Sequence, residues 1–216
     1  MNLRLKHENI LNTLWGVDIA IFPAHLSTIN LAINDLSVDK NYPDILHKDF
    51  FDLLVGTGGF DPIEWRKTRA KTLGIKEREV VFPRWFDAIV GNPPYTRQEE
   101  IDKIFPNEIN YKEMLIHKAL TFNNKKIADI NKRAGIYAYF FAHGTKFLKD
   151  KGYFGFIVSN SWLDVQYGKG IQKLFLNNYK IVAIIESKIE RWFEEADINT
   201  GIIILQKGRD YKRRGE

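Results

Sequence analysis

A short turn that begins at Asn92 holds the residue types in this sequence that are best suited to chemistry. The apolar run over 86–90 predicts a buried strand that ends directly before it. Pro93 and Pro94 lack backbone N–H groups, so the strand must stop there in a stiff, non-helical turn. Open α/β sheets bind ligands at the carboxyl ends of their strands. The sequence therefore predicts a binding site at this turn.

The turn offers two hydrogen-bond acceptors beside a flat ring. The acceptors are the side-chain oxygen of Asn92 and the backbone carbonyl of Pro93, and the ring belongs to Tyr95. This combination suits a planar group that carries an NH2, such as the exocyclic amine of a base. Accepting both amine hydrogens withdraws the nitrogen lone pair from conjugation with the ring. The nitrogen then becomes a better nucleophile without a general base.

A second polar position, Asp18, lies far upstream of the turn. Residues 14–19 predict a strand that closes on this acid, followed by a helix that has Pro23 near its start and extends to about residue 34. We expect the inner face of the helix to contain Ala24, Ile29, Leu31 and Ala32. A strand, an acid and a helix form half of a nucleotide-binding unit, in which the acid holds two ribose hydroxyls. A solvated acid that merely ends a strand is the alternative interpretation of Asp18.

The rest of the chain predicts alternating strands and helices. Strands are expected at 44–49, 153–159, 179–186 and 202–206, and helices at 136–148 and 171–177. Residues 61–84 alternate in charge and predict a surface helix with a connector. The polar stretch 96–131 follows the turn and is expected to form part of the rim of its site. Candidate contacts to a nucleic acid backbone there are Arg97, Lys103, Lys112, Lys118, Lys125 and Lys126.

Composition narrows the class of protein. The 216 residues are 44% hydrophobic, which is enough for a substantial core, and contain no apolar run long enough to span a membrane. The start of the chain lacks the apolar core of a signal peptide, so we expect a cytoplasmic protein. The absence of cysteine excludes disulfides and, with scattered histidines, argues against a metal site. A net charge of +5 favours a polyanionic partner, although a basic protein without a nucleic acid partner is the alternative.

The turn Asn92-Pro93-Pro94-Tyr95 resembles the Asn/Asp-Pro-Pro-aromatic signature of the amino-methyltransferases that use S-adenosyl-L-methionine. The segment 159–163, Ser-Asn-Ser-Trp-Leu, resembles the restriction-modification branch of the adenine-N6-specific DNA methyltransferases. This resemblance covers 11–207. It implies an α/β, Rossmann-like methyltransferase sheet, S-adenosyl-L-methionine as cofactor and double-stranded DNA as partner. The implied reaction is methyl transfer to an adenine that has flipped out of the duplex.

The resemblance also assigns roles to individual residues. The catalytic turn comprises Asn92, Pro93, Pro94 and Tyr95. The cofactor site comprises Asp18, Ile19, Asp49 and Phe50, with the ribose held by the first acid and the adenine amine by the second. Asp52 competes with Asp49 for this role. Tyr95 and Phe193 are expected to stack on the target base, although packing against the last hairpin explains Phe193 equally well.

Two parts of the family pattern are missing. The glycine-rich loop and its strand are expected before Asp18, and a target-recognition domain is expected after residue 207. The glycine-rich stretch 56–60 follows Asp18, so we interpret it as a flexible loop. Without the central first strand, the sheet would divide into two half-sheets with unpaired edges. We therefore expect an incomplete, N-terminally truncated catalytic domain over 1–207 and a basic tail over 208–216.

Several alternatives remain open at this point. The chain is a fragment, a degenerate gene product, or one piece of a split enzyme whose second chain supplies the cofactor loop and the target-recognition domain. An inactive DNA-binding or assembly remnant is a second function class. A methyltransferase for RNA or protein glutamine is a third, because those families also use Asn-Pro-Pro-Tyr. The segment 159–163 and the connector around Phe193 favour DNA.

Overall fold

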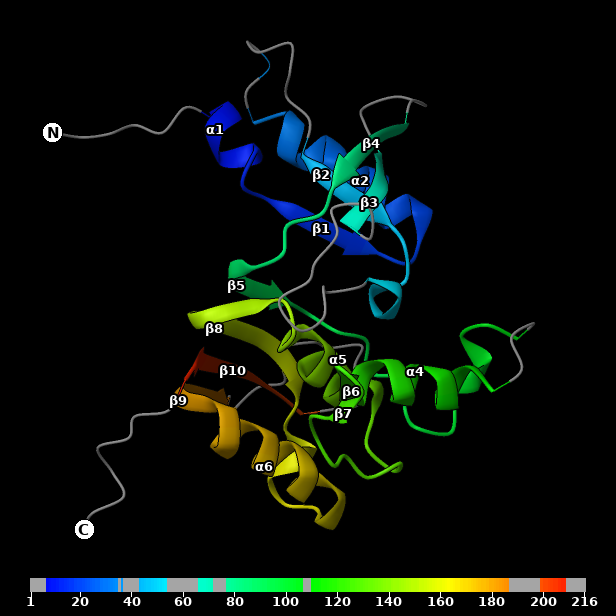
Figure 1. Ribbon diagram of the computed structural model, residues 1–216, viewed down its shortest axis with the longest axis vertical. Helices are drawn as coiled ribbons and strands as arrows, with labels where there is room; N and C mark the ends of the chain where they lie inside the picture. Colours follow the sequence, from blue (N-terminus) through cyan, green and yellow to red (C-terminus); the bar gives the residue numbers. More distant parts are fainter. Residues whose placement is uncertain are drawn as a thin grey trace, which may run out of the picture. The chain divides into compact units, whose positions relative to one another are not determined.

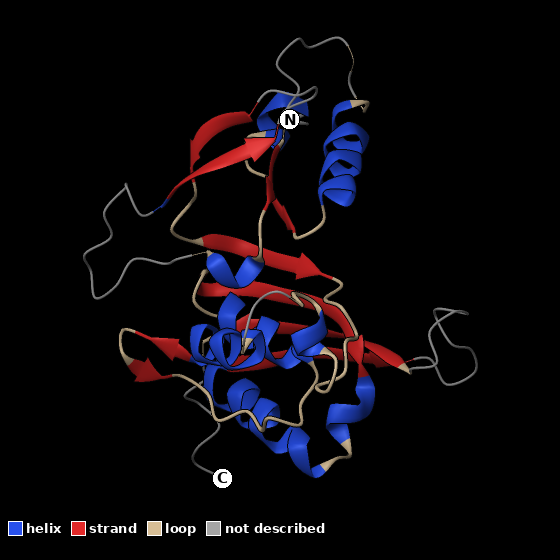
Figure 2. Cartoon of the chain, turned by 90° about the vertical axis from the view of Figure 1, so that its right-hand side faces the viewer, coloured by secondary structure: helices blue, strands red, loops and turns tan. Residues whose placement is uncertain are grey.

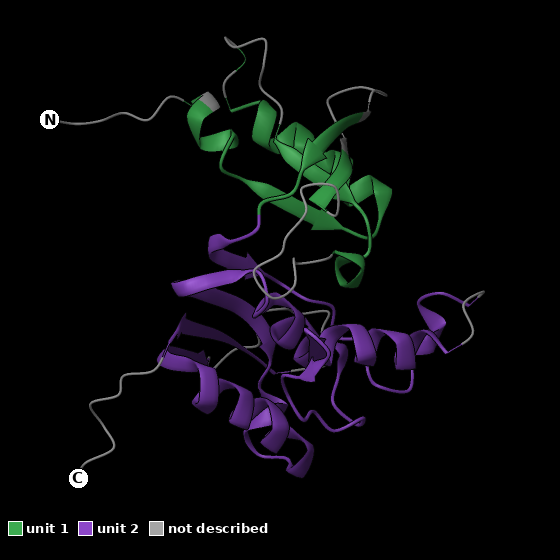
Figure 3. Cartoon of the chain, viewed as in Figure 1, with its two compact units in different colours: residues 1–83 green, residues 84–216 purple. Residues whose placement is uncertain are grey.

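The computed structural model describes residues 7–34, 36, 43–53, 66–71, 77–106, 110–186 and 199–208 (Figure 1). The chain divides into two compact units, residues 1–83 and 84–216, shown in green and purple in Figure 3. Each unit contains its own sheet, and the strands and helices of both can be followed in Figure 2. None of the helices in these described ranges has the length and apolar character that crossing a bilayer requires.

The first unit is built on a four-stranded sheet with the order β1-β2-β3-β4. Its strands are β1 (Trp15–Asp18), β2 (Asp44–His47), β3 (Lys67–Lys71) and β4 (Glu77–Val81). Its helices are α1 (His7–Leu11), α2 (Ile21–Ala32) and the short 3-10 helix η1 (Phe50–Asp52). β1 and β2 are parallel, whereas β3 is antiparallel to both of its neighbours. The predicted strand, acid and helix at 14–34 are therefore confirmed.

Helix α2 buries small residues rather than the larger ones that the pattern suggested. Ala24, Thr28 and Ala32 are buried at a spacing of four residues, whereas Ile29 is 44% exposed, so its assignment to the inner face was wrong. Thr28 is accommodated because its hydroxyl donates to the Ala24 carbonyl at 3.0 Å. Small side chains let the helix lie close to its neighbours.

The surface helix expected within 61–84 was also wrong, because the described residues there form the β3–β4 hairpin. The charges alternate with the period of two of a strand at Lys67, Arg69 and Lys71, but they are consecutive at 77–79, so the charge pattern alone did not identify the hairpin. In the observed register Arg69 faces Glu79 and Thr68 faces Val80. Opposite charges and β-branched residues that face each other across two strands stabilise antiparallel pairing.

The second unit is built on a sheet with the order β5-β8-β10-β9. Its strands are β5 (Phe86–Gly91), β8 (Leu148–Ser159), β9 (Tyr179–Glu186) and β10 (Thr200–Lys207), with a small separate hairpin of β6 (Thr121–Phe122) and β7 (Lys125–Lys126). Its helices are α4 (Tyr111–Leu120), α5 (Ile136–Gly144) and α6 (Lys169–Asn178), with 3-10 helices η2 (Ile101–Lys103), η3 (Asn160–Leu163) and η4 (Gln166–Gly168). β5 is parallel to β8, and β10 is antiparallel to both of its neighbours. Helix α4 was not predicted, although Tyr111, Leu115 and Ala119 are buried at helical spacing.

An aromatic cluster forms the core of the second unit. The ring of Phe141 on α5 lies 5.2 Å from that of Phe154, 4.9 Å from Phe156 and 4.8 Å from Phe175, measured between centroids. Phe154 and Phe156 alternate along β8, so both point to the same face of the sheet. At Gly144 a Cβ atom would lie 2.5 Å from the Phe154 ring, which requires glycine at this close approach. The core thus joins α5 and α6 to one face of the sheet.

Strand β5 is present as predicted, but the prediction that it is buried was wrong. Val90 is 80% exposed, and Asp87, Ala88 and Gly91 are also exposed. Among the described residues β5 pairs with β8 alone, just as β1 pairs with β2 alone in the other sheet. Edge strands keep one side unpaired and leave more of their side chains in solvent. Among the described residues, no strand pairs with both four-stranded sheets.

We predict that Phe141→Ala destabilises the second unit by about 3–5 kcal/mol, because it removes a buried aromatic side chain and leaves a cavity. Leu176→Ala is the matched control, since this residue of α6 is 66% exposed and should cost less than about 1 kcal/mol. Urea unfolding followed by circular dichroism measures both. Equal costs for the two variants would contradict the assignment of Phe141 to the core.

Stability is also expected to rise between pH 8 and about 10. Burial lowers the pKa of Lys146 to about 8 from its ordinary 10.5, so in this range the unfolded chain binds more protons than the folded protein. Burial lowers the pKa of Lys207 in the same direction, whereas it raises the pKa of Tyr139 to about 12, which opposes stability above pH 10. Lys146→Met should reduce the slope of the free energy of unfolding against pH, and an unchanged slope would refute this origin.

Candidate active-site turn and adjoining hollow

The turn after β5 is exposed except at one buried residue. Asn92 and Pro94 are exposed, Pro93 is buried and Tyr95 is half-buried. The Tyr95 hydroxyl donates a hydrogen bond of 2.7 Å to the Asn92 side-chain oxygen. Burial raises the pKa of Tyr95, while the hydrogen bond to Asn92 lowers it, so the hydroxyl stays protonated and remains a donor. The predicted catalytic residues therefore lie together, with the Asn92 oxygen engaged by its neighbour.

A hollow of about 550 Å³ opens beside the turn, and Tyr95 forms part of its wall. Asn92, Pro93 and Pro94 do not line it themselves. The other lining residues come from three stretches of the second unit and two single positions. They are Thr96, Arg97, Gln98, Glu99, Arg133, Gly135, Tyr137, Ser159, Asn160, Ser161, Tyr167 and Asn199. The expectation that residues after the turn form a rim is thus met by 96–99.

A backbone hydrogen bond holds two walls of the hollow together. Ile136, the first residue of α5, donates its N–H to the Thr96 carbonyl at 3.2 Å. Gly135 precedes it, and a Cβ atom there would lie 2.9 Å from the Tyr137 ring and 3.4 Å from the Thr96 carbonyl oxygen. A larger residue at position 135 would therefore require the Tyr137 ring in the lining of the hollow to shift.

Hydroxyl groups form another wall of the hollow. The Ser159 hydroxyl donates to that of Ser161 at 3.0 Å and also accepts from the Ser161 N–H at 3.3 Å. Burial raises the pKa of Tyr137, and its hydrogen bond with Ser161 acts in the opposite direction. Hydroxyls both donate and accept, so this wall can match either kind of polar edge on a planar ligand. Residues 159–163 pointed only to a family resemblance in the sequence, and this hydroxyl wall was not predicted.

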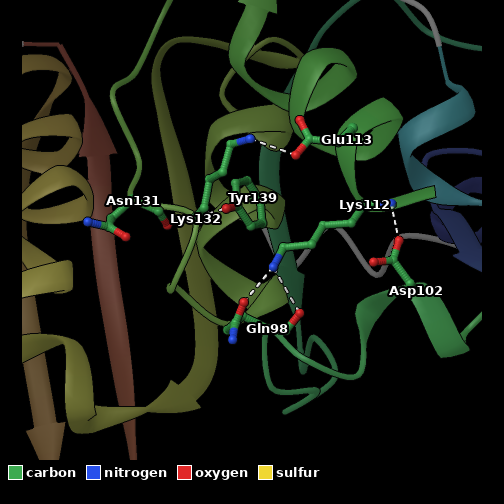
Figure 4. A network of polar contacts seen from close by, with 7 residues as sticks. All are labelled: Gln98, Asp102, Lys112, Glu113, Asn131, Lys132 and Tyr139. Atoms are coloured by element: carbon green, nitrogen blue, oxygen red, sulfur yellow. Dashed lines mark hydrogen bonds and ion pairs between the residues drawn. The ribbon is translucent and has the colours of Figure 1, made fainter. Parts of the chain in front are cut away.

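Figure 4 shows how the rim is tied to α4. The Lys112 ammonium donates to the backbone oxygen of Gln98 at 3.0 Å and to its side-chain oxygen at 2.6 Å. The Lys112 N–H donates to an Asp102 carboxylate oxygen at 2.8 Å, and Lys132 pairs with Glu113 at 2.6 Å. Lys112 therefore holds the rim in place instead of projecting freely toward a nucleic acid backbone.

The proposed cofactor residues lie in the first unit at one end of its sheet. Asp18 ends β1, and in the parallel register it lies opposite His47, two residues before Asp49. One Asp18 oxygen accepts from the Ala20 N–H at 2.8 Å, and one Asp49 oxygen accepts from the Phe51 N–H at 3.0 Å.

The residues next to these two acids lie at the same end of the sheet. Ile19 is 43% exposed and Phe50 is half-buried within η1. The competitor Asp52 is exposed, whereas Asp49 caps η1. Two acids with apolar neighbours at the carboxyl ends of two parallel strands fit S-adenosylmethionine. Carboxylates accept hydrogen bonds both from ribose hydroxyls and from the adenine amine.

Some predicted positions cannot be placed. The expected stacking residue Phe193, the glycine-rich stretch 56–60 and most of the basic tail lie outside the described residues. Within the residues that are described, no group of three or more histidine, cysteine, aspartate or glutamate side chains could hold a metal ion.

Comparison with known proteins extends across both units. The family model described as Eco57I restriction-modification methylase matches residues 12–193. Type II methyltransferase M.BstVI from Geobacillus stearothermophilus is 31% identical over 59% of this chain and 20% of its own length. Type II restriction enzyme and methyltransferase RM.Eco57I from Escherichia coli is 28% identical over 56% of this chain and 11% of its own length. The matched region thus spans a fifth or less of these two relatives.

Solved structures show the same fold. The type IIG restriction endonuclease BpuSI is similar over 90% of this chain and 19% of its own, with a TM-score of 0.60 and 19% identity. A putative class I S-adenosylmethionine-dependent methyltransferase from Listeria monocytogenes is similar over 91% of this chain and 45% of its own, with a TM-score of 0.51 and 16% identity. These likenesses confirm the predicted Rossmann-like methyltransferase fold. Since the family model also spans most of the sequence, this chain belongs to the Eco57I restriction-modification methylase family, whose cofactor is S-adenosylmethionine.

Proposed function

We propose that this chain provides the catalytic turn and the target-base pocket of an adenine-N6 DNA methyltransferase of a restriction-modification system. The observation that carries the proposal is the hydrogen-bonded pair Asn92 and Tyr95 beside a polar hollow of about 550 Å³. The hollow has room for a base with its sugar. In a duplex the adenine amine is paired, so the base must leave the stack to reach this turn.

The residues of the turn have distinct roles in this proposal. Tyr95 stacks on the extruded adenine, while the Asn92 oxygen and the Pro93 carbonyl accept the two amine hydrogens. Because the Tyr95 hydroxyl already donates to Asn92, the incoming amine shares or replaces that bond. Bound S-adenosylmethionine supplies the methyl group. Buried Pro93 holds the backbone acceptor in place, and such positioning supplies much of the acceleration in a direct transfer.

DNA is the substrate that the relatives favour. The similar structures include a nuclease-deletion mutant of the Type ISP restriction-modification enzyme LlaGI in complex with a DNA substrate mimic, with a TM-score of 0.58 and 18% identity. The proposal gives this chain the same class of partner. Residues 18, 19, 49 and 50 are the proposed cofactor positions.

A substrate panel tests the proposal directly. Purified chain is incubated with radiolabelled S-adenosylmethionine and, separately, with DNA, RNA and a glutamine-containing peptide. Label in DNA at the adenine N6 position supports the proposal, and label in RNA or peptide instead contradicts it. DNA binding without transfer to any of the three would favour an inactive DNA-binding remnant.

We predict that Asn92→Ala lowers methyl transfer to DNA by about 100-fold or more, because it removes one acceptor for the amine. The protein should fold normally, since Asn92 is exposed. Asn30→Ala, at an exposed position on α2, is the matched control and should retain full activity. Transfer at the wild-type rate by Asn92→Ala would remove this residue from the mechanism.

Two variants separate the ring of Tyr95 from its hydroxyl. Tyr95→Ala should weaken binding of the extruded adenine by about 1–3 kcal/mol, because base–aromatic stacking is lost. Tyr95→Phe keeps the ring and should retain most of the affinity. Binding is measured with DNA that carries a mismatched target adenine. Equal losses in both variants would show that the hydroxyl, and not stacking, dominates.

A further inference from the structure

We propose that Arg97 and Arg133 form an anion subsite that holds the phosphates flanking the extruded nucleotide. This inference rests on the proposed function, because it assigns the ligand of a second part of the same hollow. The hollow would then take a whole nucleotide, with the base at Tyr95 and its phosphates at the two guanidinium groups.

The fold brings the two arginines to one place although 36 positions separate them in the sequence. Both line the hollow, and both are exposed. Arg97 follows Thr96 directly, and Arg133 lies three residues before Ile136. Because the Ile136 N–H donates to the Thr96 carbonyl at 3.2 Å, the segments that hold the two arginines stay together. The arginines are therefore part of one wall and not two unrelated surface charges.

Both guanidinium groups are available to a ligand. Within the described ranges of the chain neither makes a hydrogen bond or an ion pair, and the Arg133 contact to Asn131 uses only its backbone N–H. Neighbouring cations differ, since Lys112 donates to Gln98, Lys126 pairs with Asp129 and Lys132 pairs with Glu113. Arg97 and Arg133 are thus the cations in the lining of the hollow, and no described residue of the protein occupies their guanidinium donors.

The charge of the hollow favours an anion. Its lining contains two arginines and one acid, Glu99, and its other polar groups are neutral. Guanidinium presents its donors in a planar fork that matches two oxygens of a phosphate. A neutral base would not need two such groups. A nucleotide carries a base and a phosphodiester on each side, which accounts for both the aromatic and the cationic part of the lining.

Calorimetry on the full chain tests the subsite with two small probes, 2′-deoxyadenosine and 2′-deoxyadenosine 3′,5′-bisphosphate. The bisphosphate should bind roughly tenfold more tightly or better, because charge-assisted hydrogen bonds are added. The double variant Arg97→Ala/Arg133→Ala should bind the bisphosphate as weakly as the nucleoside, with the nucleoside affinity unchanged. The double variant Arg97→Lys/Arg133→Lys should recover only part of the difference in affinity, since lysine keeps the charge but lacks the planar fork of donors. Lys173→Ala, an exposed cation on α6 outside the hollow, is the control and should behave as wild type.

The outcomes separate this inference from the proposed function. Arginine-dependent binding of the bisphosphate without measurable nucleoside binding would support the subsite while the base pocket at Tyr95 fails. Equal affinities for the two probes, an arginine-independent difference or no binding of the bisphosphate would overturn the subsite. Loss of S-adenosylmethionine binding in the arginine variants, with no change for the bisphosphate, would overturn it as well, because the anion would then belong to the cofactor.

Discussion

The parallel pairing of β5 with β8 is the constraint on which the candidate site depends. In this register Gly91 lies opposite Phe156, so the carboxyl ends of both strands lie at the same end of the sheet. The turn at Asn92 follows β5, and the hydroxyl wall begins at Ser159, the last residue of β8, and continues to Ser161. In an antiparallel pair, these two segments would lie at opposite ends of the sheet. The hollow beside Tyr95 therefore follows from strand direction before any side-chain contact is considered.

The core of the second unit keeps this pairing in place while the edge strand itself is exposed. Phe156 contacts Phe141 on the inner face, and a Cβ atom at Gly91 would lie 3.1 Å from the Phe156 ring. β5 is thus held from one side by β8 and its aromatic residues, although Val90 is 80% exposed. This explains how a strand with little burial of its own can end in a defined turn.

Polar contacts divide the cations of the second unit into two kinds. Those such as Lys112 and Lys132 are used inside the protein, where they join the rim to α4 and α4 to the segment before α5. Arg97 and Arg133 line the hollow, and their guanidinium groups make no hydrogen bond or ion pair with the residues that the structure describes. Net charge alone cannot make this distinction, because it counts both kinds equally. What separates Lys112 and Lys132 from these two arginines is that an acceptor of the protein lies within reach of each lysine.

Local sequence determined the proline turn after β5, the strand that ends at Asp18, and most later strands and helices, because proline chemistry and hydrophobic periodicity act over a few residues. It failed where short-range patterns were ambiguous: the charges of 67–71 and 77–81 fit a surface helix until a strand partner is known. The prediction that β5 is buried was wrong for a related reason. Whether a strand lies at the edge of a sheet depends on the strands that pair with it and not on its composition. Only the tertiary structure placed Arg133, Gly135 and Ser159 beside Tyr95, because these positions meet through a parallel strand pair and one backbone hydrogen bond that no local pattern encodes.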